Sequence, residues 1–479
     1  MGAGVSNWCL AKAVSRLGQL GVVSGTALDV ILARRLQEGD PGGDLRRALD
    51  RFPFPGVAQR VLDRYFIPGG KPAEQPFKPT PLLSVQPAPA LLELIVLANF
   101  VEVFLAKEGH AGLVGINYLQ KIQLPTLPSL FGAMLAGVDY VLVGAGIPMA
   151  IPGILDQLAR GEAVRMKLDV DGVASGEEFF CSFDPAAFCA GVPPTLKRPN
   201  FLAIISSTVL AMALARKASG RVDGFVIEGP TAGGHNAPPR ETGKLNERGE
   251  PVYGSRDVPD IDKIRALGLP FWMAGSYATP ARLAEAMSLG ATGVQIGTAF
   301  AFCEESGIEP EIKARVLRSC RSGSLEVFTD PKASPTGFPF KVAKLEGTMS
   351  EEELYAARER ICDLGYLRSA FRKPDGSLGY RCPGEPEENY VAKGGEIEDT
   401  PGRKCVCNGL MSTIGLSQIQ PWGYLEPAFL TAGDDVTGLT RFLPAEQNSY
   451  SAADVIHYML GLPAGVAAEH RPLEEAKRS

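Results

Sequence analysis

Short apolar runs, each followed by a turn and then by apolar residues at helical spacing, recur along the first two thirds of the chain. The runs lack the alternation of apolar and polar positions that marks a half-buried strand, so they are typical of strands buried on both faces of a parallel sheet. The predicted strands span residues 21–24, 112–118, 138–143, 201–206, 223–228, 270–274 and 293–297. This alternation of strands and helices predicts an α/β chain.

The last of these units has the clearest boundaries. Thr279 and Pro280 suit the N-cap and first residue of a helix, and Gly290 suits its end, just before strand 293–297. A crossover this short joins neighbouring parallel strands. The opening residues MGAGVSNW indicate the exit of an eighth strand whose body would lie before Met1. We therefore expect a (β/α)8 TIM barrel with a truncated first strand and a site where the strands end.

Two stretches interrupt the barrel pattern, and a third region follows it. Residues 40–90 are rich in proline and arginine, which predicts an elaborated loop with short helices, and residues 163–200 predict an inserted hairpin. After residue 345, Ser350 with Glu353 predicts a capping-box helix, and a final helix is expected after Ser451. The predicted domains are a barrel over 1–345 and a helical, cysteine-containing C-terminal extension, or lid, over 346–479.

The composition of the chain limits the classes of partner that we expect it to bind. The 479 residues carry a formal charge of −6 with no basic run, which removes the attraction that nucleic acids and anionic membranes exploit. The most apolar stretch, 88–106, contains Glu93, Asn99 and Glu102 and is predicted to be a buried amphipathic helix. Without a signal segment at the start, and with nine cysteines in so long a chain, we expect a reducing, cytoplasmic setting.

One of only four histidines follows a predicted strand directly. His235 ends the run EGPTAGGH after strand 223–228, and its two preceding glycines let backbone approach a planar ligand. An imidazole above the strand ends is suited to act as a base near neutral pH, so His235 is the candidate catalytic residue. His110, His457 and His470 are expected to be packed or solvated.

A second candidate site lies after the two last strands. Ala274-Gly275-Ser276 and Gly297-Thr298 offer backbone N–H groups and hydroxyls beside the N-terminus of a helix, which together predict an anion-binding cup. The chain has no G-x-G-x-x-G in a strand-to-helix context and no GK[ST] motif, which disfavours a Rossmann fold or an ATPase.

The ordered set GAGVSNW, GINYL, VDYVLVGAGIP, VIEGPTAGGH, PFWMAGSYATP and GATGVQIGTAF resembles the nitronate monooxygenase (2-nitropropane dioxygenase-like) family of FMN-dependent TIM barrels over about residues 1–345. The resemblance implies FMN, with its phosphate on Gly275, Ser276, Gly297 and Thr298 and its ring near Gly2, Ala3, Gly4, Asn117, Gly233 and Gly234. Ala274 and Gln295 complete this implied set. His235 matches the histidine that some members use as a base.

The chain departs from the family pattern around the implied substrate. Ser276 stands where a second glycine is common, and Glu228 and Thr231 stand where nitronate oxidisers carry glutamine and then glutamate. The chain is also similar to the enoyl-reductase-like flavoproteins of fatty-acid and polyketide synthases, which share the barrel and the Gly-Gly-His element. Trp422 and Tyr424 are candidates for the pocket mouth.

The cysteines outside the barrel are Cys362, Cys382, Cys405 and Cys407. Four thiolates suffice for a zinc ion, but a structural zinc site usually offers two close pairs, and here only the C-x-C pair is close. Buried free thiols and no metal are therefore predicted, with metal binding left open.

The resemblance implies oxidation of an alkyl nitronate, or a similar carbanion, by O2 to a carbonyl product and nitrite. One alternative is an NAD(P)H-dependent enoyl-thioester reductase, and another is a flavin-binding accessory protein without turnover. The expected partners are a small-molecule substrate and O2, with no nucleic acid and no membrane. The oligomeric state stays open, a homo-oligomer included.

Overall fold

The computed structural model of the chain describes residues 2–241, 243–443 and 447–463, so Met1 and His470 lie outside the described residues. A parallel sheet has the hydrogen-bonded order β1-β2-β3-β7-β8-β9-β10. Its strands are β1 Gly21–Ser24, β2 Val114–Leu119, β3 Tyr140–Gly144, β7 Asn200–Ile205, β8 Gly224–Glu228, β9 Phe271–Ala274 and β10 Gly293–Gln295. All seven predicted strands are confirmed, with small shifts at their ends.

The two edge strands of this sheet, β1 and β10, are not paired with each other among the described residues. The N-terminal residues lie at this gap, because the Ser24 amide donates to the Ser6 carbonyl oxygen (2.8 Å) and the Gly307 amide donates to that of Val5 (2.8 Å). The structure therefore shows a seven-stranded parallel α/β sheet. The eighth strand was predicted to lie before Met1, so the closed barrel stays a prediction.

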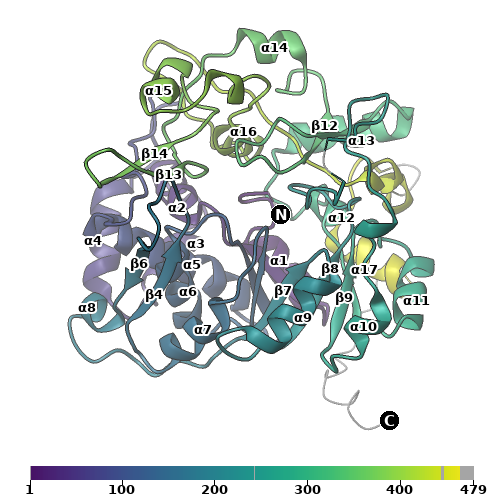
Figure 1. Cartoon of the computed structure of the whole chain (residues 1–479), viewed down its shortest axis with the longest axis horizontal. Helices are drawn as coiled ribbons and strands as arrows, with labels where there is room; N and C mark the ends of the chain where they lie inside the picture. The colour runs from purple at the N-terminus through teal and green to yellow at the C-terminus, as the bar shows by residue number, and fades with distance from the viewer. Residues whose placement is uncertain (1, 242, 444–446, 464–479) are drawn as a thin grey trace.

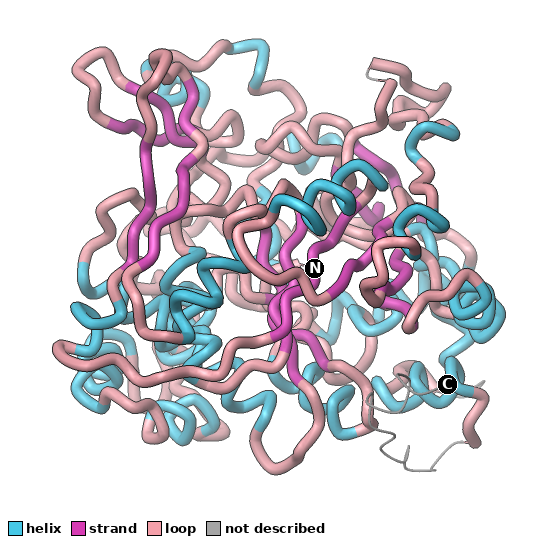
Figure 2. The backbone as a smooth tube through the Cα atoms, turned by 60° about the horizontal axis from the view of Figure 1, so that its bottom comes forward, coloured by secondary structure: helices cyan, strands magenta, loops and turns pink. Residues whose placement is uncertain are grey.

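Helices surround the central strands (Figure 2). They are α1 Trp8–Arg16, α2 Leu28–Gln37, α5 Pro89–Lys107, α6 Thr126–Leu135, α7 Ile151–Ala159, α9 Thr208–Lys217, α10 Ile261–Arg265, α11 Pro280–Ser288, α12 Thr298–Ala301 and α13 Pro310–Ser322. By length and composition alone, α5 is the one helix of the described residues that could cross a membrane, and 72% of its apolar window is buried inside the protein. The predicted buried helix is thus confirmed. Thr279 caps α11 as predicted, since its side chain accepts from the Arg282 amide.

Both predicted interruptions are present. The loop over residues 40–90 contains α3 Asp44–Leu49 and α4 Pro55–Tyr65. The stretch 163–200 contains the antiparallel hairpin of β4 Val164–Leu168 and β6 Phe179–Phe183, together with β5 Val170–Asp171 and α8 Pro185–Cys189. This hairpin lies to one side of the central strands (Figures 1 and 2).

The C-terminal extension is less helical than predicted. Its α-helices are α14 Glu352–Ala357, α15 Glu387–Ala392, α16 Val406–Thr413 and α17 Ala452–Leu460. It also contains the 3-10 helices η2 Ile397–Asp399 and η3 Asp434–Phe442. The 3-10 helix η1 Ser255–Asp257 lies outside the extension, in the loop after β8. Two hairpins were missed: β13 Ser369–Arg372 with β14 Leu378–Arg381 lies in the extension, whereas β11 Glu326–Asp330 with β12 Phe340–Lys344 lies just before it, within the residues assigned to the barrel. Strand β13 also pairs in parallel with β5, so the inserted stretch and the extension share one small sheet.

One of the two helix starts predicted in the extension is wrong. Helix α14 begins at Glu352, and Ser350 does not cap it, because the Ser350 hydroxyl hydrogen-bonds with the backbone of Leu345 instead. The start of α17 is confirmed, since Ser451 caps it in a reciprocal box with Asp454.

Buried polar contacts fasten the extension to the barrel half of the chain. Tyr366 hydrogen-bonds with the buried Asp29 of α2, and the Arg34 guanidinium donates to the Leu416 carbonyl oxygen (2.5 Å). The Gln418 side chain forms two hydrogen bonds with the backbone of Phe77: it accepts from the amide at 2.7 Å and donates to the carbonyl oxygen at 2.9 Å. In Figure 1 the green segments of the extension, with α14, α15 and α16, lie above the strands, whereas the yellow helix α17 lies beside α11 and α12.

Candidate functional site

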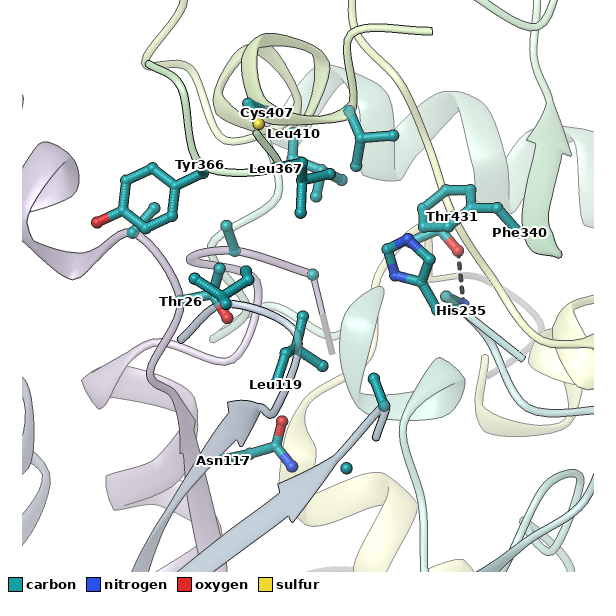
Figure 3. A pocket seen from close by; sticks show the side chains of 18 of the residues that line it. Thr26, Asn117, Leu119, His235, Phe340, Tyr366, Leu367, Cys407, Leu410 and Thr431 are labelled. Atoms are coloured by element: carbon teal, nitrogen blue, oxygen red, sulfur yellow. Dashed lines mark hydrogen bonds between the residues drawn. The ribbon is translucent and has the colours of Figure 1, made fainter. Parts of the chain in front are cut away.

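A large cavity lies where the strands of the parallel sheet end. Asn117 of β2, Gly144 of β3, Ile204 of β7, Glu228 of β8 and Gln295 of β10 each contribute to its wall. Its space, including the open mouth, is about 960 Å³. Because the ends of parallel strands meet at one edge of the sheet, residues far apart in the sequence converge here. Figure 3 shows Asn117 and Leu119 on one side of this cavity and His235 on another.

His235 stands in the cavity wall in a fixed orientation. Its Nε2 is hydrogen-bonded to the Ser334 hydroxyl at 2.6 Å, and its ring meets the Phe340 ring edge-on, with centroids 4.7 Å apart. Its backbone pairs with Phe340 of β12 as an isolated bridge. Burial, and then the charge of Lys121, hold the pKa of His235 well below its ordinary value. The imidazole is therefore neutral at pH 7, as a general base must be.

Lys121 and Glu228, a base and an acid, are buried near this histidine, and Glu228 is itself part of the cavity wall. Burial lowers the pKa of Lys121 to about 7, and burial raises the pKa of Glu228 to about 7, while the attraction between the two opposes both shifts. The Lys121 ammonium donates to the Thr336 hydroxyl at 3.3 Å, and Thr336 is hydrogen-bonded to Ser334 at 2.8 Å. A continuous polar chain thus runs from Lys121 to His235.

The Gly233-Gly234 turn is covered by a C-terminal segment, residues 431–434. The Gly234 amide donates to the Thr431 hydroxyl at 2.8 Å, as the dashed line in Figure 3 shows. The Gly433 amide donates to the Thr298 hydroxyl at 2.9 Å. A Cβ added at Gly233 would lie 2.8 Å from the Gly433 nitrogen, so the close approach of the two backbones requires glycine here.

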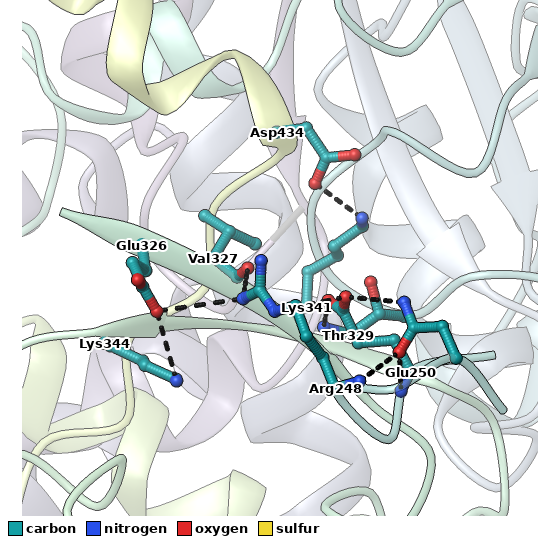
Figure 4. A network of polar contacts seen from close by, with 9 residues as sticks. Arg248, Glu250, Glu326, Val327, Thr329, Lys341, Lys344 and Asp434 are labelled. Atoms are coloured by element: carbon teal, nitrogen blue, oxygen red, sulfur yellow. Dashed lines mark hydrogen bonds and ion pairs between the residues drawn. The ribbon is translucent and has the colours of Figure 1, made fainter.

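An ion pair anchors the 431–434 segment. The Lys341 ammonium of β12 lies 2.6 Å from an Asp434 carboxylate oxygen, and the lysine side chain is only 6% exposed. Figure 4 shows this pair beside Glu250, which accepts from the Thr329 amide at 2.9 Å. The loop after β8, the β11–β12 hairpin and the C-terminal segment are therefore joined through charged groups.

The predicted anion cup has free donors. Among the described residues, no hydrogen-bond acceptor is recorded for the amides of Gly275, Ser276 and Gly297. Gly275 has φ +100° and Ser276 has φ +57°, a left-handed conformation that is unfavourable for a serine. Strained backbone with unsatisfied amides is typical of a ligand-binding turn.

The structure brings about half of the predicted site residues to the cavity. Gly2, Ala3, Asn117, Gly233, Gly234, His235 and Gln295 line it, whereas Gly4, Ala274, Gly275, Ser276, Gly297 and Thr298 do not. A Cβ on Gly4 would meet the Ile414 and Ile31 side chains, so that glycine faces the packed interior. The cup instead adjoins the cavity across the 431–434 segment, since Thr431 lines the cavity and Gly433 contacts Thr298.

Sequence reasoning missed the apolar part of the wall. It comes from β12, the loop before β13, and α16, through Phe340, Leu364, Tyr366, Leu367, Val406, Cys407, Leu410 and Met411. The apolar clusters LGYL and VCNGLM within an otherwise polar region were the available signal. Trp422 and Tyr424, predicted at the mouth, do not line the cavity: Trp422 is 60% exposed and donates to Glu359, and Tyr424 donates to Glu426.

A sequence model of the nitronate monooxygenase family matches residues 150–329, which include His235 and the anion cup. Over this segment the chain is similar to the nitronate monooxygenase family. A probable nitronate monooxygenase of Staphylococcus haemolyticus is 31% identical over 154 residues, which are 30% of this chain and 42% of that protein. The chain thus spans less than half the length of this curated relative.

Two solved structures are also similar to this chain. FabK from Thermotoga maritima is 15% identical with a TM-score of 0.45, over 95% of this chain and 88% of that one. A nitroalkane oxidase from Streptomyces ansochromogenes is 14% identical with a TM-score of 0.43, over 96% of this chain and 93% of that one. These scores are too low to transfer fold or function.

Proposed function

We propose that this chain is an FMN-dependent oxidoreductase that oxidises a stabilised carbanion, with an alkyl nitronate as the first substrate class to test. The observation that carries the proposal is His235, a neutral imidazole in the wall of a largely apolar cavity. The unprotonated imidazole has a lone pair for the α-proton of a nitroalkane, and the negative charge of the nitronate formed beside it would offset the burial that lowers the pKa of His235. The family match over residues 150–329 supports the same reaction class.

The residues present fit FMN in two places. The unsatisfied amides of Gly275, Ser276 and Gly297 suit a phosphate. Gly233 and Gly234 leave the cavity wall without side chains, which suits a flat ring. FMN, when bound, would supply the electron chemistry, with O2 as the electron acceptor and a carbonyl compound and nitrite as products.

The protein's own part is to position and to move one proton. His235 would take the α-proton of a neutral nitroalkane, and it would hydrogen-bond with the anion if a nitronate is supplied directly. The Ser334 hydroxyl at 2.6 Å holds the ring orientation in either case. The apolar wall from α16 excludes water, which strengthens these contacts.

The test combines spectra with turnover. The purified full chain should be yellow or should take up added FMN, and propyl-2-nitronate should bleach the flavin under argon and release nitrite in air. His235→Ala should abolish turnover of neutral 2-nitropropane but retain most turnover of the nitronate, while His110→Ala, which removes a ring bonded to the Ala106 carbonyl oxygen, should retain both. A chain that binds no FMN would refute the proposal.

One observation favours a second candidate, an FMN- and NAD(P)H-dependent enoyl-thioester reductase. The cavity wall contributed by Leu364, Leu367, Leu410 and Met411 offers more apolar surface than a small nitronate needs and suits an acyl chain. Bleaching by NADPH under argon, with none by the nitronate, would decide for the reductase.

A further inference from the structure

Four cysteines far apart in the sequence surround one small cavity. Cys362 lies after α14, Cys382 follows β14, and Cys405 and Cys407 stand at the start of α16. All four line a space of about 300 Å³, its opening to solvent included, which is separate from the FMN candidate site but adjoins it. Within the described residues no disulfide joins them.

The rest of the lining offers these sulfurs little else to bond with. It consists of Pro335, Leu364, Gly365, Leu367, Arg368, Gly384, Val406 and Asn408, with no carboxylate among them. The Cys405 thiol has a weak contact with the Ile361 carbonyl oxygen at 3.7 Å. Four soft donors that converge on an otherwise apolar space are the ligand set that thiophilic metals select.

The geometry distinguishes a cluster from a single ion. In the described part of the chain, no group of three or more His, Cys, Asp or Glu side chains is arranged to hold one metal ion. Zinc would require the four sulfurs to close on a point about 2.3 Å from each. Here they instead surround a cavity, which an iron–sulfur cubane with four cysteine ligands would fill.

We propose that Cys362, Cys382, Cys405 and Cys407 ligate a [4Fe–4S] cluster. Its assembly takes up two ferrous ions, two ferric ions and four sulfide ions, and each of the four ligating thiols releases its proton as its iron–sulfur bond forms, so that no further oxidant or reductant is needed. The cluster would cross-link the loop after α14, the turn after β14 and the start of α16, and the first and last of these also form a wall of the large cavity, since Leu364, Leu367, Val406 and Cys407 line both spaces. Its role is therefore structural, and it does not depend on the proposed reaction.

The experiment uses the full chain, expressed with iron and cysteine supplements and purified under argon. Iron, acid-labile sulfide and zinc are measured per chain, and EPR spectra are recorded after reduction with dithionite. We expect about four iron and about four sulfide atoms per chain. Cys362→Ser and Cys382→Ser should each lower both contents strongly. Cys320→Ser should leave them unchanged, because that buried thiol lies in α13 and contacts the Val436 carbonyl oxygen.

A second measurement covers the case in which the serine variants fail to fold. Oxidative removal of iron from the wild-type chain by ferricyanide and EDTA should lower its melting temperature, and reconstitution should restore it. One zinc per chain, or soluble folded chain without iron after anaerobic reconstitution, would overturn the proposal. These readouts do not use flavin or turnover, so they are independent of the test of the proposed function.

Discussion

The Lys341–Asp434 ion pair predicts an unequal effect of its two partners. The Asp434 carboxylate is 44% exposed, whereas the Lys341 side chain is 6% exposed. Asp434→Ala leaves an ammonium group inside the protein, with Glu250 as a more distant carboxylate. Lys341→Met removes the buried charge, keeps a side chain of similar shape, and leaves a carboxylate that water can reach. Substitution of the more exposed residue, Asp434, should therefore lower the stability of the protein more than substitution of Lys341.

The magnitudes follow from burial. Loss of a hydrogen bond to a charged, buried group costs about 1.5–3 kcal/mol, so Asp434→Ala should destabilise the protein by about 2 kcal/mol. Lys341→Met should cost less than about 1 kcal/mol. An unfolding entropy of about 2.1 cal/mol/K per residue over 479 residues gives about 1 kcal/mol/K, so the melting temperatures should fall by about 2 °C and by less than about 1 °C.

Thermal unfolding followed by circular dichroism measures both variants and the double variant. The double variant should resemble Lys341→Met, because no buried charge is left without a partner in it. If Lys341→Met were as destabilising as Asp434→Ala, the buried ammonium would not be the source of the cost. The reasoning about the anchor of the 431–434 segment would then be wrong.

Three further predictions test other parts of the structure. Ser276→Gly should raise the melting temperature, because glycine adopts the φ of +57° without the strain of about 1 kcal/mol, whereas an unchanged or lower value would exclude strain there. Gly132→Ala should lower the free energy of unfolding by several kcal/mol, since a Cβ would overlap the Val96 carbonyl oxygen where α6 crosses α5. A soluble variant that unfolds in urea like the wild-type chain would contradict this packing. Burial raises the pKa of Glu228 from an ordinary 4.5 to about 7, so the folded state holds this proton more tightly than the unfolded state does. The resulting contribution to the free energy of unfolding is fully present below about pH 4.5 and is lost as the pH rises to about 7. Glu228→Gln should therefore flatten the decline in melting temperature over this pH range.

The predictions succeeded where the determining interactions are local. Runs such as FLAIIS are apolar at successive positions, so the sequence alone predicts a strand that is buried on both faces. The observed strand β7 confirms this prediction. Thr279-Pro280 and Ser451 set their helices through bonds within one turn, which needs no tertiary information. His235 was identified because a histidine after two glycines at a strand end is a short-range pattern.

The predictions failed where distant segments decide the outcome. Ser350 and Glu353 have capping-box spacing, but the fold directs the Ser350 hydroxyl to the Leu345 backbone, and the helix starts later. The sequence predicted glycines at the cup, yet only the folded chain lays residues 431–434 between the cup and the cavity.

The C-terminal extension shows the same difference between what the sequence determines and what the tertiary structure determines. By itself, the sequence determined the parallel α/β pattern, the family resemblance and the position of the candidate base. The tertiary structure alone decided that Leu364, Tyr366 and Leu410 line the cavity, and that four scattered cysteines surround one space. The physical reason is that strand burial and helix caps depend on neighbours in the chain. A cavity wall or a ligand set depends on long-range packing, which sequence spacing does not encode.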